Sequence, residues 1–413
     1  MNKLTRFDWY SLILYIILVV IGLVNIYSTM YNSSDNSIAL GFIQKQVISF
    51  GLGIVLICII QFFDTRFFER YASIIYLISI ASLIGLWFFG TEVSGARSWY
   101  GIGGFSLQPS EFAKVAVALA LAKFLGDFNT QIKRTKDYLG AFLIMGIPAI
   151  LTLLQPDPGT ALVLLGFFLV LHSEGLPSFF FTILISLFVL FISTLLLGMY
   201  WVMFAIMLLV TLNIAFQFKR KRKKVVFSAV ITSLLFCGFT YSVSYIFEHI
   251  FEQRHRDRFN ILLGKEVDTQ GIGYNINQSQ IAIGSGRFSG KGFLEGTQTK
   301  GGFVPEQQTD YIFTTIGEEW GFVGSAFVLL LFVALILRIV RVAYKQKTTF
   351  ARVYCLGFAC TLFIHVAINL GMVAGLIPTI GIPLALMSYG GSSLLAFSIF
   401  LGIYLRIVYQ RMD

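Results

Sequence analysis

The chain has 413 residues, of which 56% are hydrophobic and only 13% are charged, and its mean hydropathy is +0.79. A soluble domain carries about 25% charged residues, so this composition excludes a water-soluble protein and indicates helices that span a membrane. The net charge is +10, but Lys and Arg cluster in short loops between apolar runs, which argues against nucleic-acid binding.

Apolar runs that suit a bilayer recur along the whole chain. The first run follows MNKLTRFDWY and has no small-residue cleavage site, so we expect a retained span rather than a removed signal peptide. We predict about twelve spans, over residues 10–28, 46–63, 72–90, 111–126, 139–155, 160–173, 178–197, 200–217, 225–247, 311–337, 353–376 and 383–405.

Groups of Lys and Arg orient these spans. They precede the first run and follow the second, fourth, eighth, tenth and last runs, so all fall on one side if twelve spans alternate. That side is the cytoplasm, and both termini are therefore predicted to be cytoplasmic. The polar segments 90–108, 155–159 and 248–310 then face outward. Segment 248–310 also contains many apolar residues, which favours short amphipathic pieces over a disordered loop.

The cysteines and histidines carry no obvious site. All four cysteines lie in apolar runs and are interpreted as small buried hydrophobes rather than a disulfide framework. The four histidines form no pair at the spacing of metal ligands, which argues against zinc.

Two opposite charges lie near the start of the fourth run. Glu111 and Lys114, in QPSEFAKV, are three residues apart and therefore share one face of a helix. Ser110 precedes them as the predicted helix N-cap. The pair is either an ion pair that anchors the helix at the interface or the charged lining of a substrate cavity.

Two aspartates lie in turns. Asp157, in QPDPG, is typical of a turn residue whose carboxylate caps the next helix. Asp268, in EVDTQGIGYN, lies near glycines that permit close backbone approach. It is either a turn former or a general base that acts on a sugar hydroxyl.

Two further motifs are polar. The stretch GSGRFSGKG (284–292) lacks the spacing of a P-loop, but its glycine amides, with Arg287 or Lys291, suit contact with a diphosphate. The stretch GEEWG (317–321) places Glu318 and Glu319 at the start of the tenth run, where we expect them to face a cavity or a partner rather than lipid.

Motifs spread over nearly the whole chain match one family in the same order. They are GARSW (95–99), LQPSEFAK (107–114), QPDPGTALV (155–163), RFN (258–260), DTQGIGYNINQSQIAIGSG (268–286), GKGFLEGTQ (290–298), FVPEQQTDYIF (303–313), GEEWG (317–321) and LMSYGGSSLL (386–395). With them the chain resembles the SEDS (FtsW/RodA/SpoVE) family of peptidoglycan glycosyltransferases. QPDPGT, GTQ and QTDYIF are more similar to the elongation members (RodA) than to the division members (FtsW).

The resemblance implies an all-α, polytopic membrane bundle that forms a single domain over residues 1–413. The family core has ten spans, so this chain is predicted to carry a two-span insertion within 176–247, around a basic cytoplasmic loop. Residues 248–310 would then form the large extracytoplasmic catalytic loop.

The resemblance also implies polymerisation of lipid II into glycan strands during cell elongation, in the bacterial inner membrane. Asp268 matches the family's essential loop aspartate and would deprotonate the 4-hydroxyl of the acceptor sugar. That hydroxyl would attack the anomeric carbon of the donor, and undecaprenyl diphosphate would leave. The predicted substrate-binding residues are Arg97, Trp99, Ser110, Glu111, Lys114, Asp157, Arg258, Gln278, Ser279, Lys291, Glu306 and Asp310.

Further components follow from the same resemblance. A divalent cation, Mg²⁺ or Mn²⁺, would neutralise the leaving diphosphate, and a class B penicillin-binding protein is the expected transpeptidase partner. The alternatives are a septal polymerase of the FtsW type, a flippase or transporter for lipid II, and a scaffold for cell-wall assembly without chemistry of its own.

Overall fold

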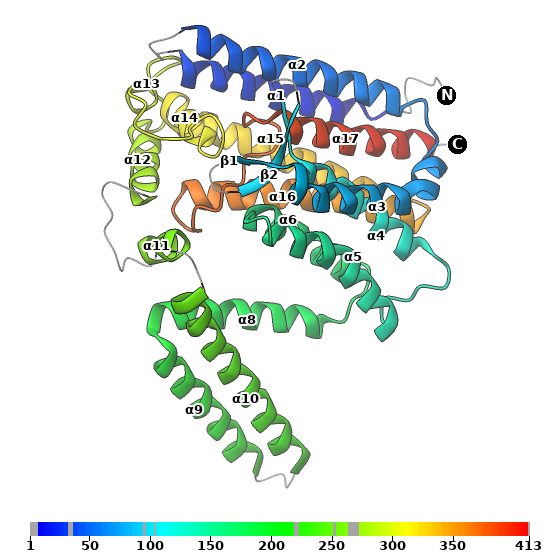
Figure 1. Ribbon diagram of the computed structural model, residues 1–413, viewed down its shortest axis with the longest axis vertical. Helices are drawn as coiled ribbons and strands as arrows, with labels where there is room; N and C mark the ends of the chain where they lie inside the picture. The colour runs from blue at the N-terminus through cyan, green and yellow to red at the C-terminus, as the bar shows by residue number, and fades with distance from the viewer. Residues whose placement is uncertain are drawn as a thin grey trace. The chain divides into compact units, whose positions relative to one another are not determined.

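The computed structural model describes residues 7–31, 36–93, 96–102, 105–218, 223–250, 253–262 and 272–411. The chain divides into two compact units, Met1–Leu176 with Tyr274–Asp413, and Pro177–Gly273. Figure 1 labels the elements. The helices of the first unit are α1 (Trp9–Met30), α2 (Asn36–Ile60), α3 (Thr65–Phe89), α4 (Pro109–Gly126), α5 (Thr135–Leu153), α6 (Pro158–Leu165), α7 (Phe168–Ser173), α12 (Ile272–Ser285), α13 (Thr297–Lys300), α14 (Ile312–Glu319), α15 (Gly321–Ala343), α16 (Thr349–Val373) and α17 (Gly391–Arg411).

The described helices confirm a polytopic membrane protein. Nine of them are long and apolar enough to cross a bilayer, and two shorter apolar stretches cover Pro158–Ser173 and Met199–Leu212. Together with α4, which carries three charged residues, they account for every predicted run. The sequence pattern therefore located each of these apolar helices, although several boundaries differ.

Helix α4 lies at the centre of the first unit. It packs against α3, α5, α16 and α17, and most of its residues are buried. Its sequence AKVAVALALA alternates alanine with valine and leucine, and small side chains let neighbouring helices approach closely. This packing carries the charges near the start of α4 into the interior of the bundle.

A small antiparallel sheet precedes α4, and the sequence analysis did not predict it. It consists of β1 (Thr91–Val93), β2 (Ala96–Ile102) and β3 (Phe105–Leu107), in that order. Thr91 lies opposite Trp99, and Tyr100 lies opposite Leu107. Strands β1 and β3 have three residues each, too few to show the alternation of a half-buried strand, and the sequence of β2, ARSWYGI, does not alternate apolar with polar residues.

Two of the predicted spans become helical, or continuously helical, only about ten residues later than expected. The run 311–337 is divided into α14 and α15, because Gly321 has a φ of 63° and a Cβ there would lie 2.3 Å from the amide nitrogen of Gly290. The run 383–405 becomes helical only at Gly391. Pro378 and Pro383 precede it, and proline disfavours helix at and just before its own position.

The second unit contains α8 (Ser178–Leu197), α9 (Met199–Phe218), α10 (Lys223–Tyr245), a π-helical turn (Ile246–Ile250) and α11 (Gln253–Leu262). Helix α10 packs against α8 and α9, and Figure 1 shows α9 and α10 as an antiparallel pair. The predicted insertion, 176–247, falls almost wholly in this unit. That it is an insertion into a ten-span core stays a prediction.

Candidate active site

Three ionisable groups meet in the interior of the first unit. The ammonium of Lys114 lies 2.8 Å from Oε2 of Glu111, and the two side chains are 1% and 5% exposed. On its other side, the Lys114 ammonium lies 2.9 Å from Nε2 of His365, on α16. The predicted pair therefore exists, and it lies within the bundle rather than at a solvated helix end.

The contacts of His365 define its protonation state. An ammonium only donates hydrogen bonds, so Nε2 accepts from Lys114. Nδ1 lies 3.1 Å from the carbonyl oxygen of Pro383, which only accepts, so Nδ1 carries the hydrogen. His365 is therefore neutral and holds the residues before α17 next to Lys114. The sequence analysis missed it, and the only signal was a histidine in the middle of an apolar span.

The start of α4 differs from the predicted start. The helix begins at Pro109, its N-cap is Gln108, and no side chain caps it. Ser110 is therefore not the cap; it is buried inside the first turn, and its hydroxyl has no partner among the described residues. Proline at the first helical position explains the shift, because its fixed φ suits that position.

Asp157 caps α6, as the sequence predicts. Its carboxylate accepts from the amide of Thr160 at 3.0 Å and from the hydroxyl of Thr160 at 2.8 Å. The side chain of Gln108 donates to the same carboxylate at 3.2 Å, which joins the start of α6 to the start of α4. Burial, and to a lesser extent the charge of Glu111, raise the pKa of Asp157.

Arg97 and Trp99 lie on β2, and no described hydrogen bond or ion pair joins their side chains to Glu111, Lys114 or Asp157. Nε of Arg97 lies 3.7 Å from Oε2 of Glu92, and both side chains are more than half exposed. Trp99 is half-buried and pairs through its backbone with Thr91. Ser98, between them, donates to the carbonyl oxygen of Gln155 at 3.3 Å, which holds the sheet against the turn before α6.

The structure describes only some of the predicted site residues of segment 248–310. Asp268 lies outside the described residues, and Arg258 is placed on α11 without a described side chain. On α12, Ser279 is buried and its hydroxyl contacts the hydroxyl of Thr314 at 3.0 Å and the carbonyl oxygen of Val373 at 3.1 Å. Ser279 thus joins α12 to α14 and α16, whereas Gln278 is half-exposed.

Glu306 and Asp310 shape the turn before α14. Glu306 has a φ of 52°, and its carboxylate accepts from the hydroxyl of Thr309 at 3.2 Å. The backbone carbonyl of Asp310 accepts from the side chain of Asn369 at 2.7 Å, and the same amide group donates to Ile382 at 2.9 Å. Asn369, which the sequence analysis missed, therefore connects this turn to the residues before α17.

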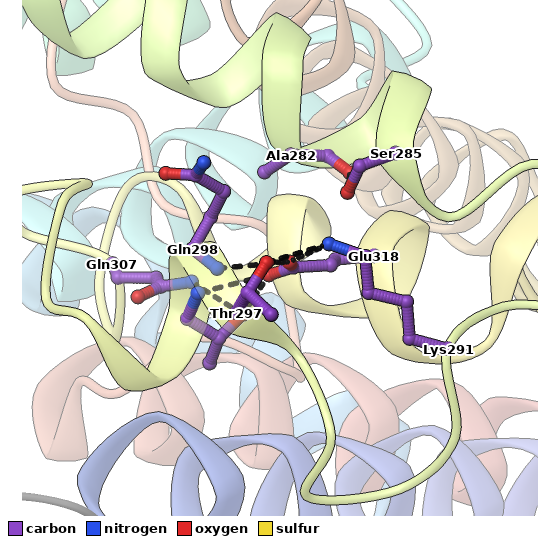
Figure 2. Close-up of polar contacts among 8 residues, drawn as sticks. Ala282, Ser285, Lys291, Thr297, Gln298, Gln307 and Glu318 are labelled. Atoms are coloured by element: carbon purple, nitrogen blue, oxygen red, sulfur yellow. Dashed lines mark hydrogen bonds and ion pairs between the residues drawn. The ribbon is translucent and has the colours of Figure 1, made fainter.

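A second buried ionic network surrounds Glu318, and Figure 2 shows Lys291, Thr297 and Gln298 converging on its carboxylate. The ammonium of Lys291 lies 2.7 Å from Oε1 of Glu318 and donates to the hydroxyl of Thr297 at 2.7 Å. The amide of Gln298 donates to Oε1 at 2.9 Å, and Thr299 donates to Oε2 through its amide (2.8 Å) and its hydroxyl (2.7 Å).

The neighbouring acid is bound separately. The hydroxyl of Ser28, on α1, donates to Oε1 of Glu319, and burial raises the pKa of Glu319. Both acids of GEEWG are thus buried and bound by other residues of this chain. This agrees with the expectation that they do not face lipid. The sequence analysis did not identify Glu318 as an anchor for the loop.

Two separate ionic clusters, each around a buried carboxylate, contain charged residues of the predicted motifs. Glu111, Lys114 and His365 meet at one, and Lys291 and Glu318 meet at the other. In the described part of the chain, no three His, Cys, Asp or Glu side chains gather in a way that could hold a metal ion. A metal site built by protein ligands alone is therefore not supported there.

Known proteins are similar to this chain in sequence and in fold. A sequence model of the FtsW/RodA/SpoVE family, described as cell cycle protein, matches residues 8–413. The chain is 32% identical to the peptidoglycan glycosyltransferase MrdB of Escherichia coli (strain K12) over 410 residues, which cover 99% of this chain and 97% of MrdB. It is also 32% identical to the peptidoglycan glycosyltransferase RodA of Treponema pallidum (strain Nichols) over 422 residues, which cover 97% of each chain.

A solved structure supports the same relationship. The chain matches one chain of a peptidoglycan synthase complex, described for its structural coordination of polymerization and crosslinking, with a TM-score of 0.72 and 28% identity. The match covers 98% of this chain and 99% of that chain.

Proposed function

The chain belongs to the FtsW/RodA/SpoVE (SEDS) family of cell cycle proteins, and from this premise we propose that it is a peptidoglycan glycosyltransferase that polymerises lipid II. The observation that carries the proposal is the match of the family model to residues 8–413, together with full-length relatives that are named peptidoglycan glycosyltransferases. The substrate would be an undecaprenyl-diphosphate-linked disaccharide-peptide, whose tail stays in the bilayer while its sugars react outside.

In the proposed reaction, Asp268 removes the proton from the 4-hydroxyl of the acceptor sugar. The oxygen then bonds to the anomeric carbon of the donor, the bond from that carbon to the diphosphate oxygen breaks, and undecaprenyl diphosphate leaves with the electron pair. Because a diphosphate is a good leaving group, the residues that bind it need to stabilise negative charge rather than donate a proton.

We assign the buried pair Glu111 and Lys114 to substrate binding, since charges inside a membrane bundle are costly and usually functional. The other predicted substrate contacts of the sequence analysis remain proposals on the same footing. A divalent cation also remains a proposal. Mg²⁺ usually keeps several waters and binds through one or two carboxylates plus substrate phosphates, so a cluster of protein ligands is not required.

We propose an elongation role, in which the protein maintains cell shape. Three motifs resemble the elongation members, and the relative from Treponema pallidum carries the name RodA. A septal role of the FtsW type is the alternative. Depletion of the protein distinguishes them, because loss of elongation rounds cells up whereas loss of division produces filaments.

The proposed location is the bacterial inner membrane, with cytoplasmic termini, and the proposed partner is a class B penicillin-binding protein. The solved structure of a synthase complex that coordinates polymerization and crosslinking supports a partner of this kind. A transpeptidase would cross-link the strands as they are made.

The decisive experiment uses the purified protein in liposomes with lipid II added to the outer leaflet only. We expect the wild type to form glycan polymer without transferring lipid II across the bilayer, and Asp268→Ala to form none. Glu266→Ala, two residues earlier in the same loop, is the matched control and should keep activity. Polymerisation by Asp268→Ala at the wild-type rate would refute the role of Asp268 as the general base. Transfer without polymer would favour a flippase, and neither activity would favour a scaffold.

A further inference from the structure

The carboxylate of Glu318 is the centre of an anchored loop. Glu318 is 0% exposed, and its two oxygens accept from the side chain of Lys291 and from the backbone of Gln298 and Thr299 (Figure 2). One acid at the end of α14 therefore holds both ends of the segment 291–299. Because a buried carboxylate is costly unless it is paired, the Lys291 ammonium cannot leave without a penalty.

Backbone contacts fix the same loop against α14. The amide of Lys291 donates to the carbonyl of Glu318, and the amide of Gly292 donates to the carbonyl of Glu319, each at 3.0 Å. A Cβ on Gly286 would lie 2.0 Å from the carbonyl oxygen of Gly317. The loop therefore approaches α14 more closely than any other residue type would permit at that position.

The residues before this anchor, together with Lys291, line an open polar pocket of about 670 Å³. It is lined by Ile281, Gly284, Ser285, Gly286, Arg287, Ser289, Gly290 and Lys291. The lining includes two cations, two hydroxyls and three glycine backbones, and it includes no acid. Ser285 donates to the carbonyl of Ala282 at 2.7 Å, so its oxygen remains able to accept a hydrogen bond but not to donate one.

The two cations contribute differently to this pocket. An ammonium has three N–H groups, and Lys291 uses two of them on Glu318 and Thr297, which leaves one for a ligand. Its charge is balanced by Glu318. Arg287 is exposed and has no ion-pair partner among the described residues, so it supplies the net positive charge. Such a lining matches an anion with several acceptor oxygens.

An apolar groove adjoins the pocket. It measures about 620 Å³, shares Gly284 and Arg287 with the pocket, and runs along the first half of α15 from Gly321 to Val333. Its other lining residues are Ile283, Phe313, Gly317, Phe322, Ser325, Ala326, Leu329 and Leu330. A charged pocket at the end of an apolar groove on a membrane-spanning helix matches a diphosphate attached to a prenyl chain.

We propose that this pocket binds the diphosphate of the prenyl-linked substrate and product, and that Glu318 is a positioning residue which holds Lys291 in place for it. The proposal rests on the proposed function, because that function supplies the prenyl diphosphate. Arg287 and the free N–H of Lys291 bind the phosphate oxygens, and the groove along α15 takes the first units of the prenyl chain.

Direct binding tests the pocket without turnover. The binding of fluorescent undecaprenyl diphosphate to the full-length protein in nanodiscs is measured for the wild type, Arg287→Ala and Lys291→Met. We expect about a tenfold higher Kd in each variant, which is the loss of one charge-assisted hydrogen bond. Lys300→Met, at the exposed end of α13, is the matched control and should bind as the wild type does.

The competitors identify the source of the diphosphate. Unlabelled undecaprenyl diphosphate should compete best, inorganic pyrophosphate should compete weakly, and phosphatidylglycerol should not compete. Equal competition by phosphatidylglycerol would make this a general site for anionic lipid headgroups and would overturn the proposal. So would an unchanged Kd in both Arg287→Ala and Lys291→Met.

A double-mutant cycle tests the positioning role of Glu318. Glu318→Gln keeps an acceptor for Thr299 but removes the charge that holds Lys291. We expect it to raise the Kd of the folded protein severalfold in the wild-type background and to have no further effect on Lys291→Met. Additive effects would contradict the role, and a loss of stability with an unchanged Kd would reduce Glu318 to a structural residue.

The proposed function and this inference fail in different ways. If the wild type does not polymerise lipid II, the proposed function fails, whatever the binding assay shows. If it polymerises lipid II while Arg287→Ala and Lys291→Met bind undecaprenyl diphosphate normally, only this inference fails.

Discussion

Lys114 is a fully buried lysine, at 1% exposure, in the described part of the chain. Its ammonium is bound by a carboxylate and a neutral imidazole, at 2.8 and 2.9 Å. Desolvation of two charges offsets much of their attraction, so the pair itself adds little stability. Removing only one partner lowers the stability of the protein strongly, because the other charge then stays buried without compensation.

We therefore expect Lys114→Met to destabilise the protein by about 3–5 kcal/mol. Lys123→Met, in the last turn of the same helix, should cost much less, because its ammonium only donates to the carbonyl of Arg70. The measurement is thermal unfolding of the detergent-solubilised variants. The double variant Glu111→Gln with Lys114→Met should recover part of the loss. A double variant that is less stable than Lys114→Met would show that the pair is not the cause.

The stability that Glu318 contributes should depend on pH. Burial by itself raises the pKa of Glu318, but the hydrogen bonds from Lys291, Gln298 and Thr299 outweigh it, so the pKa lies below its ordinary value of 4.5. As the pH falls below 4.5, the unfolded chain takes up a proton before the folded chain does. The contribution is therefore complete above this pH and is lost as the pH falls towards the folded-state pKa.

Thermal unfolding of the wild type and Glu318→Gln at pH 7 and at pH 4 measures this effect. We expect the wild type to be clearly more stable at pH 7 and the difference to shrink at pH 4. Glu295→Gln, an exposed carboxylate of the same loop, controls for the removal of charge alone. A difference that grows on acidification would mean that Glu318 is protonated in the folded protein.

At the scale of elements, glycines determine how the loop before α13 packs against α14. Gly290 has a φ of 79°, and a Cβ there would lie 2.1 Å from the carbonyl oxygen of Glu319. Gly321, which faces it, has a φ of 63°. Both positions favour glycine, because other residues are strained at positive φ and the backbones are in contact.

Gly290→Ala should therefore destabilise the protein by about 1–3 kcal/mol, from backbone strain and overpacking. Gly146→Ala is the matched control, because Gly146 lies within α5 and a Cβ there meets no atom within 4 Å. Its stability should equal or slightly exceed that of the wild type, since alanine favours a helix over glycine. Equal unfolding temperatures for Gly290→Ala and the wild type would contradict the close approach.

At the scale of the whole molecule, α15 separates the loop of the Glu318 network from the loop after Ala343. Its 23 residues span about 34 Å, which is enough to cross a bilayer. The predicted orientation places the residues before α15 outside the cell and the basic residues after it inside. The proposed reaction requires this orientation, since the sugars of the substrate react on the outer face.

Cysteine labelling in intact cells tests the orientation. In a chain whose four native cysteines are replaced by alanine, Glu295→Cys should react with a membrane-impermeant maleimide. Lys345→Cys, an exposed residue after α15, should react only after the membrane is permeabilised. The reverse pattern would place the proposed catalytic loop in the cytoplasm and would remove the basis of the proposed function.

Much of the molecule follows from the sequence alone. Composition and the length of apolar runs determined that the chain is a membrane helix bundle, because unsatisfied backbone groups are not tolerated in lipid. The spacing of Glu111 and Lys114 predicted their pairing, since residues three apart share a helix face. The turn chemistry of QPDPG likewise predicted the capping role of Asp157. Each of these is a local property of a few neighbouring residues.

Contacts between residues distant in the sequence were decided only by the tertiary structure. His365 meets Lys114 across 251 positions, and Gln108 meets Asp157 across 49. Glu318 holds Thr299 and Lys291 because α14 ends where a glycine loop can approach it. Hydrophobic periodicity and turn chemistry carry no information on such partners, because helix packing in the membrane brings them together after each helix has formed.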